Sequence, residues 1–114
     1  MRLIIRAAEP HDVETMLGGR PKYSMRGIAV RNGERCIGLC GVQHGQYYDA
    51  FSTITDEMRK YPGAIWRAAV KFRALLNQYE GPVFARAGEA TAPAFLERIG
   101  FEPIGEDMYQ WPIR

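Results

Sequence analysis

Long apolar runs, cysteine clusters and a dominant charge sign are all missing from this sequence. No stretch approaches the roughly 20 apolar residues that span a bilayer, and the start carries Arg2 and Arg6, so we expect a soluble, cytoplasmic protein with no membrane partner. Cys36 and Cys40 fall in one predicted strand, roughly 13 Å apart at the usual rise per residue, too far for a disulfide. Fifteen Lys and Arg against thirteen Asp and Glu argue against a dedicated nucleic-acid-binding protein.

Signatures of several enzyme classes are absent as well. The only histidines, His11 and His44, are far apart, and no Cys/His cluster has the spacing of metal ligands, so we expect no bound metal. The lone Ser24 and Ser52 lack the context of a nucleophile elbow, and there is no P-loop or dinucleotide fingerprint. Hydrolase and nucleotidase functions are therefore disfavoured.

What is present is a regular series of short elements. The 114 residues, 46% of them hydrophobic, are enough for one domain over 1–114 with one core. An apolar run from Leu3 predicts a first strand, and Pro10 with Asp12 opens a short helix that Gly18-Gly19 ends. Asn32-Gly33 predicts a tight hairpin turn, because both central residues of that turn need positive φ. Three antiparallel strands follow from this reading, at 27–30, 36–43 and 47–54.

The second half begins with the clearest helix. Apolar residues recur at steps of three and four over 62–79, and Gly81-Pro82 ends the pattern. A strand at 83–85, a last helix near 95–99 capped by Thr91 or a neighbour, and one or two terminal strands complete the chain. We therefore predict a mixed α/β (α+β) fold, with a central, mostly antiparallel sheet of six to seven strands flanked by three helices.

This order of elements, with three local motifs, resembles the GNAT superfamily of N-acetyltransferases. The motifs are the helix and Gly-Phe ending at 92–101, the opening at 5–8 followed by Asp12, and the basic segment at 59–64 that opens the long helix. The last of these is similar to short GNAT-like proteins of tailed bacteriophages. The resemblance implies a GNAT-like fold over nearly the whole chain and acetyl-CoA as a substrate.

The resemblance also implies where acetyl-CoA would lie. A helix that directly follows a strand presents free N–H groups that suit a pyrophosphate, and the pantetheine arm would lie where the fourth and fifth strands part, beside residues 51–64. The implied cofactor-binding residues are Ile54, Arg59, Lys60, Gly63, Ala64 and Phe95. Two features depart from the family: Ile65 stands where a small residue is usual, and Pro62 removes one N–H donor. The basic residues could equally form a solvated helix face.

Acetyl transfer to an amine needs a base for the amine and an acid for the departing thiolate. The best-placed carboxylates are Asp49, on the fourth strand, and Glu57, in the loop after it; His44 is a further candidate, and Glu89 stands where the family often has an asparagine. Ordinary surface charge is the alternative for these carboxylates. The family's acidic tyrosine aligns with Leu96, which cannot donate a proton, so Tyr109, Tyr48 or Tyr47 would have to replace it, although each could be a core aromatic.

Two functions remain open at this stage. The first is a CoA-dependent N-acetyltransferase, encoded by a phage, that acts on an amine of a protein or a small molecule. The second is a catalytically inactive GNAT-fold protein that serves as a virion component or binds a host protein. A bulge in the fourth strand that opens a groove would favour the enzyme, and a groove plugged by Ile65, Phe84 or Tyr48 would favour the binding protein. In either case a homodimer could pair through the C-terminal strand.

Overall fold

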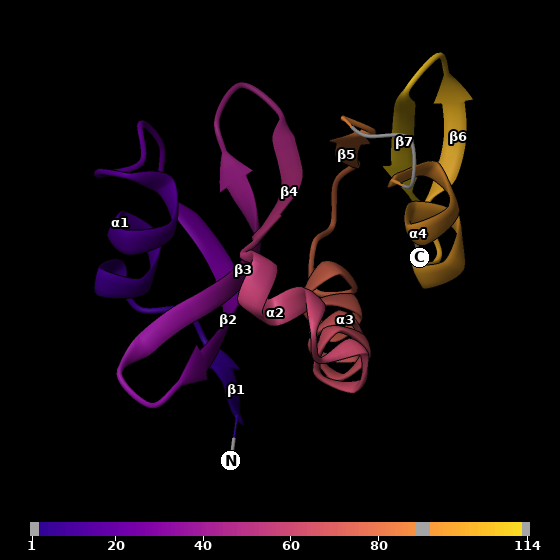
Figure 1. The fold of residues 1–114 in the computed structure, drawn as a ribbon. Coiled ribbons are helices and arrows are strands. Elements are labelled where there is room, and N and C mark those ends of the chain that lie inside the picture. The colour runs from indigo at the N-terminus through magenta and orange to yellow at the C-terminus, as the bar shows by residue number, and fades with distance from the viewer. Residues whose placement is uncertain (1–2, 89–91, 113–114) are drawn as a thin grey trace.

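The computed structural model describes residues 3–88 and 92–112 of the chain, and Figure 1 shows its fold. Within that part the chain forms seven strands and four helices, one helix more than the sequence predicts. In chain order these are β1 (Leu3–Ala7), α1 (Pro10–Leu17), β2 (Met25–Asn32), β3 (Arg35–His44), β4 (Tyr48–Ile54), α2 (Asp56–Arg59), α3 (Pro62–Leu76), β5 (Val83–Arg86), α4 (Ala92–Ile99), β6 (Glu102–Gly105) and β7 (Met108–Trp111). The predicted cap Thr91 lies outside the described residues.

All seven strands belong to one sheet in the order β1-β2-β3-β4-β5-β7-β6. Every pair is antiparallel except β4 with β5, which is parallel. The predicted mixed, mostly antiparallel sheet is thus confirmed. The C-terminal strand β7 has a neighbour on both sides, so it offers no free edge for a homodimer, contrary to our expectation; β6 is the edge strand at this end, and its four residues are exposed.

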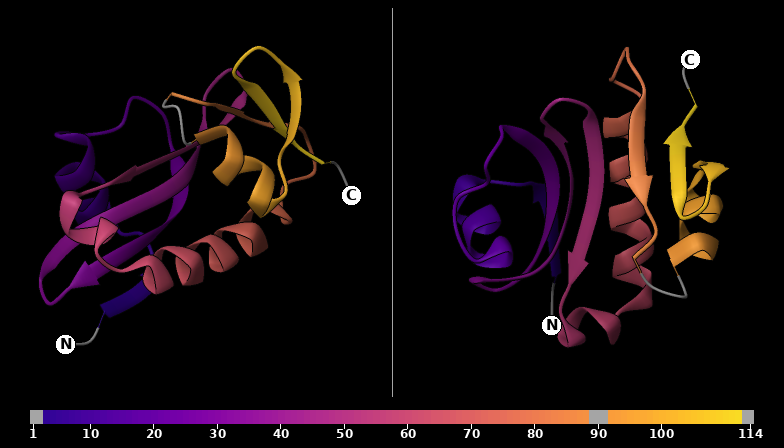
Figure 2. Two further views of the ribbon diagram at one scale, coloured as in Figure 1. Left: turned by 45° about the vertical axis from the view of Figure 1, so that its right-hand side comes forward. Right: turned by 90° about the horizontal axis from the view of Figure 1, so that it is seen from above.

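Helices cover the two faces of the sheet, as Figure 2 shows. Helix α1 packs on one face, where Val13 joins Ala29, Cys36 and Leu39 in a small apolar cluster. Helices α3 and α4 share the other face and bury the larger core, which includes Phe72, Leu76, Ile99, Phe101, Tyr109 and Trp111. No helix in the described part of the chain is both long and apolar enough to cross a membrane.

The β2–β3 hairpin forms as predicted, but its turn lies one residue later. Asn32 pairs with Arg35, so Gly33 and Glu34 are the two loop residues. Only Gly33 has a positive φ, of 64°, which is typical of a turn with glycine at its first central position. The prediction of positive φ at Asn32 was therefore wrong. The amide of Asn32 instead donates to the carboxylate of Glu57, an interaction that holds it at the end of β2.

The glycines of β3 mark a bulge and a close approach, as their frequency indicates. The register shifts between Val30 and Arg31, which leaves Ile37 as the extra residue of β3. Gly27 and Gly41 face each other on β2 and β3, and a Cβ on either would lie within 2.8 Å of a carbonyl oxygen of the other strand. A side chain at either position would push the two strands apart.

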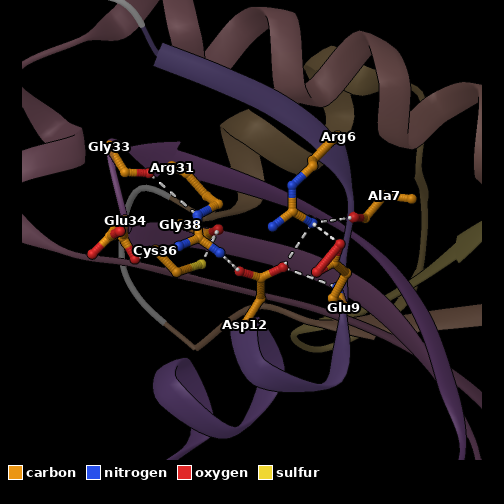
Figure 3. Close-up of polar contacts among 9 residues, drawn as sticks. All are labelled: Arg6, Ala7, Glu9, Asp12, Arg31, Gly33, Glu34, Cys36 and Gly38. Atoms are coloured by element: carbon orange, nitrogen blue, oxygen red, sulfur yellow. Dashed lines mark hydrogen bonds and ion pairs between the residues drawn. The ribbon is translucent and has the colours of Figure 1, made fainter.

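A buried carboxylate fastens α1 to the sheet. Asp12 is fully buried and accepts hydrogen bonds from Arg6 and Arg31, both at 3.0 Å, and from the backbone N–H of Glu9 at 2.9 Å (Figure 3). Arg31 also donates to the carbonyl oxygens of Gly33 and Glu34. One carboxylate therefore links β1, β2 and the start of α1. From sequence alone Asp12 is predicted in the first turn of the helix and in the opening motif, without its partners Arg6 and Arg31.

Candidate functional site

The two parallel strands of the sheet separate after three residue pairs. Tyr48, Asp49 and Ala50 of β4 pair with Val83, Phe84 and Ala85 of β5, whereas β4 continues to Ile54. Beyond Ala50, backbone groups of β4 that point away from β3 have no partner on β5. The separation needs no bulge in β4, because the β3–β4 register is continuous from Tyr48 to Ile54. The bulge in the fourth strand that would have favoured the enzyme is thus absent from the β3–β4 ladder.

A cavity of about 410 Å³ opens beside this separation, on the face that α3 covers. Two rows of residues from β2, β3 and β4 form its floor: Ile28, Cys40 and Ser52 are direct neighbours across the strands, and Val30, Gly38 and Ile54 form the next row. Helix α3 forms the roof, and α2 and α4 close the sides. The lining residues from the helices are Met58, Arg59, Ile65, Ala68, Ala69, Phe72, Phe95 and Ile99.

The inner part of this cavity is apolar. Val30, Met58, Ala68 and Ile99 are buried apolar side chains that line it. The polar side chains that line the floor are the exposed Ser52, on β4, and Cys40; burial raises the pKa of the Cys40 thiol to about 12, so it stays protonated and uncharged. Ile65 lines the cavity without closing it, and neither Tyr48 nor Phe84 is among the lining residues. The plugged groove that would have favoured a binding protein is therefore not observed.

Basic residues surround the outer end of the cavity, at the junction of α2 and α3. Arg59 lines the cavity, and Lys60 and Arg67 are exposed nearby on the same segment. Several backbone amides of this junction already have acceptors. The N–H of Lys60 donates to Glu57 O, that of Tyr61 to Met58 O, and that of Ala64 to Tyr61 O, at 2.9 to 3.2 Å.

Only one N–H remains at this helix start for an anion. Pro62 has none, and the N–H of Gly63 has no backbone acceptor among the described residues. A Cβ on Gly63 would meet nothing closer than the Arg67 guanidinium at 3.6 Å, so the space beside its Cα is open. The residues fit a single phosphate held by one amide and the neighbouring basic side chains better than they fit a full pyrophosphate cradle.

Glu57 lies in helix α2 and not in a loop, which corrects our expectation. Thr55 caps this helix: its hydroxyl accepts from the N–H of Met58 at 3.2 Å and donates to Ile37 O at 2.9 Å. The Glu57 carboxylate accepts from Asn32 and, at 2.9 Å, from Arg35, so it binds α2 to the β2–β3 hairpin. The short helix was missed because four residues are too few for a periodic pattern.

Asp49 and Tyr109 lie on opposite faces of the sheet where β4 and β5 part. Ala50 belongs to the core under α3, and because side chains alternate along a strand, the exposed Asp49 points to the other face. Tyr109 pairs with Ala85 and is buried on the α3 and α4 face. Burial raises the pKa of Tyr109, and the carboxylates of Glu97 and Asp107 act in the same direction, so the phenol keeps its proton at neutral pH.

His44 belongs to a separate aromatic cluster at the other end of β4. Its Nε2 lies 2.6 Å from the Tyr79 hydroxyl, and its ring makes edge contacts with Tyr48 and Tyr79. Ser24 is 3.4 Å from the second ring nitrogen. None of these residues lines the cavity.

The structure brings together three of the six residues named for the cofactor. Ile54, Arg59 and Phe95 line the cavity, while Lys60, Gly63 and the buried Ala64 lie at the α2–α3 junction beside its outer end. Glu89 lies outside the described residues. Sequence reasoning missed the floor residues Ile28, Cys40 and Ser52, because only the strand register places them side by side. Among the described residues no three His, Cys, Asp or Glu side chains are arranged to hold a metal ion.

Sequence comparison finds no matching family model and no matching curated protein. Solved structures are nevertheless similar over almost the whole chain. The ribosomal-protein-S18-alanine N-acetyltransferase from Escherichia coli aligns with a TM-score of 0.69 at 12% identity, over 98% of this chain and 94% of its own. A proposed GNAT-family acetyltransferase from Desulfovibrio desulfuricans aligns with a TM-score of 0.67 at 12% identity, over 99% of this chain and 100% of its own.

A third solved structure is a proposed N-acetyltransferase from Escherichia coli that was determined with coenzyme A bound. It aligns with a TM-score of 0.57 at 17% identity, over 98% of this chain and 100% of its own. At such identities the likeness concerns the fold alone. The chain therefore has the fold of the GNAT N-acetyltransferases.

Proposed function

We propose that this protein is a CoA-dependent N-acetyltransferase that transfers an acetyl group from acetyl-CoA to an amine of a protein or a small molecule. The observation that carries the proposal is the cavity that opens where β4 and β5 part, beside the start of α3. A scaffold with no ligand would gain stability by filling a cavity of this size. The similar fold of a protein determined with coenzyme A bound supports the same ligand.

The proposed binding roles follow from position. Arg59 and Lys60, with the free N–H of Gly63, would hold phosphate oxygens at the outer end of the cavity. Unpaired backbone groups of β4 beyond Ala50 would bind the amides of the pantetheine arm, as an added strand would. Ile54 and Phe95 would pack against the arm. Ala64, which is buried at the start of α3, would let the helix approach β4 closely.

The proposed chemistry uses the two faces of the sheet. The amine would approach from the face that carries Asp49, and the carboxylate would accept a proton from it, directly or through water. The amine nitrogen then bonds to the thioester carbonyl carbon and the carbon–sulfur bond breaks. Tyr109, on the opposite face and still protonated, would deliver a proton to the sulfur. Glu57 remains a second candidate base, although its carboxylate already binds Asn32 and Arg35.

A second function, a GNAT fold without catalysis that binds a virion or host protein, is favoured by one observation. The helix start retains one free N–H for phosphate, because the other amides are bonded and Pro62 has none. Leu96 at the position of the family's acidic tyrosine points the same way. A bacteriophage origin and a place in the host cytoplasm belong to these proposals and rest on the sequence resemblance alone.

Calorimetric titration with acetyl-CoA and CoA separates the two functions. We expect micromolar binding that Lys60→Glu weakens and Gly63→Trp abolishes. Gly63 has open space around it and Gly19 is equally unconfined, so Gly19→Trp is a matched control that should bind like the wild type. An absence of heat up to millimolar cofactor would overturn the enzyme and favour the binding protein.

A further inference from the structure

The floor of the cavity extends two strands beyond β4. Ser52 of β4 pairs with Cys40 of β3, and Cys40 pairs with Ile28 of β2. These three residues form an inner row that crosses three strands under α3. At about 4.8 Å between neighbouring strands the row is roughly 10 Å long. The pantetheine arm, in the function proposed above, follows the other edge of β4, where β5 has parted from it. That arm alone leaves the inner row unfilled.

The side chains around the inner row do not suit the polar, pantetheine part of the thioester donor. Pantetheine carries amides, and an amide buried without a hydrogen-bond partner is strongly disfavoured. The hydroxyl of the exposed Ser52 stands at the β4 end of the row; beyond it, Ile28, Val30, Ala68 and Phe72 offer no hydrogen bond, and the Cys40 thiol is directed to Ile28 O. An unbranched hydrocarbon chain is the group that suits such a wall.

Small residues in the roof keep this space open. Ala68 and Ala69 are buried in α3 directly above the floor rows. Gly38, in the second row, makes room for the Met58 side chain, because a Cβ there would overlap the Met58 sulfur. Leucine at Ala68 or Ala69 would project into the cavity.

We propose that the cavity binds the acyl chain of the thioester donor and that this chain is a linear, apolar one longer than acetyl. The inference rests on the CoA-dependent acyl transfer proposed above and replaces acetyl-CoA by a longer-chain acyl-CoA as the donor. A row of roughly 10 Å corresponds to an acyl chain of about eight carbons, given carbon–carbon bonds near 1.5 Å. The chain turns from the thioester near Ala50 across Ser52 toward Cys40 and Ile28.

Calorimetric titration with acetyl-CoA, octanoyl-CoA and octanoate tests this assignment. Each buried methylene strengthens binding roughly fourfold, so burying half of the six extra methylenes makes octanoyl-CoA bind about sixtyfold more tightly than acetyl-CoA. Equal affinities for the two esters would overturn the inference and leave the acetyltransferase standing. No binding of either ester would refute the acyltransferase itself. Octanoate binding as tightly as octanoyl-CoA would assign the cavity to a free fatty acid and also overturn the proposal.

Two variants shorten the cavity from opposite sides. Ala69→Leu lowers the roof, and Ile28→Phe fills the inner end of the floor from a half-buried position, so one of them is informative even if the other does not fold. We expect each to reduce the affinity for octanoyl-CoA at least tenfold and to leave that for acetyl-CoA within twofold. Val70→Leu, on the exposed side of α3, is the matched control. Undiminished octanoyl-CoA binding in a folded variant would contradict the assignment.

Discussion

At the scale of single residues, Asp12 shows how one side chain can hold several segments. Its carboxylate is fully buried with two arginines and a backbone N–H as donors. Removing one partner of a buried ion pair leaves the other charge without compensation. We expect Asp12→Asn to lower the free energy of unfolding by about 3 kcal/mol, measured by urea denaturation.

Glu14 provides the control on the same helix. It forms a 3.6 Å ion pair with Arg20, whose side chain is 91% exposed. Exposed pairs of this kind contribute little, so Glu14→Gln should change the free energy of unfolding by less than about 0.5 kcal/mol. Equal effects of the two substitutions would show that the Asp12 network does not hold α1 to the sheet.

The thiol of Cys40 predicts a dependence of stability on pH. Burial raises its pKa from 9.0 to about 12, so the folded protein keeps this proton at a pH where the unfolded chain loses it. Ionisation then favours the unfolded state, and Cys40 contributes a fall in the free energy of unfolding of up to about 1.4 kcal/mol per pH unit above pH 9. Well below pH 9, where the thiol is protonated in both states, it contributes no slope.

The variant Cys40→Ala isolates this contribution. The urea midpoint of the wild type should fall faster between pH 8.5 and 10 than that of the variant, whatever the difference between them at pH 7.5. Cys36, whose pKa is also raised by burial, contributes in the same sense in both proteins, so it cancels. Parallel pH profiles would show that the Cys40 thiol ionises equally in the folded and unfolded states.

At the scale of elements, the β2–β3 turn gives the sharpest prediction. Gly33 has a φ of 64°, a conformation that is unfavourable for a residue with a Cβ. We expect Gly33→Ala to destabilise the protein by about 1 kcal/mol, measured as a shift in the urea midpoint. Gly19 has no positive φ and no neighbour within 4 Å, so Gly19→Ala should be neutral or slightly stabilising. A neutral Gly33→Ala would contradict the turn assignment.

The sequence predicts elements where local patterns are strong. The spacing of apolar residues predicts α3 well, although the helix ends at Leu76 and not at Tyr79. Asn77 follows as its C-terminal cap and accepts a hydrogen bond from the Trp111 indole at 3.0 Å. The shifted turn at Gly33 and the short helix α2 depend on contacts of Asn32 and Thr55 with distant residues, which no local pattern records.

The candidate site is less predictable than the elements. The α2–α3 junction and Ile54 follow from the resemblance, because the strand-to-helix connection is local. The cavity floor does not, since Ile28, Cys40 and Ser52 are neighbours only through the register of three strands. The β3 bulge at Ile37 contributes to that register: without the extra residue, Gly38 and Cys40 would turn to the other face.

At the scale of the whole molecule, the sheet consists of two unequal parts joined at one narrow seam. Strands β2, β3 and β4 share long antiparallel ladders of eight and seven residue pairs. Three pairs connect β4 to β5, and four connect β5 to β7. Helix α3 spans the seam because it packs on β1 and β2 and also contributes Phe72 and Leu76 to the core under α4. A ligand in the cavity would touch both parts.

Amide hydrogen exchange followed by mass spectrometry tests this division. We expect peptides from β2 and β3 to exchange most slowly and those from β5, β6 and β7 more quickly, because the shorter ladders open at a lower free energy. Saturating octanoyl-CoA should slow exchange in β4 beyond Ala50, in the first turns of α3 and in α4, and leave β1 unchanged. Protection confined to the α2–α3 junction would indicate that only the phosphate end of the donor is bound. Uniform exchange across all strands without ligand would refute the narrow seam, since a single cooperative unit exchanges its amides together.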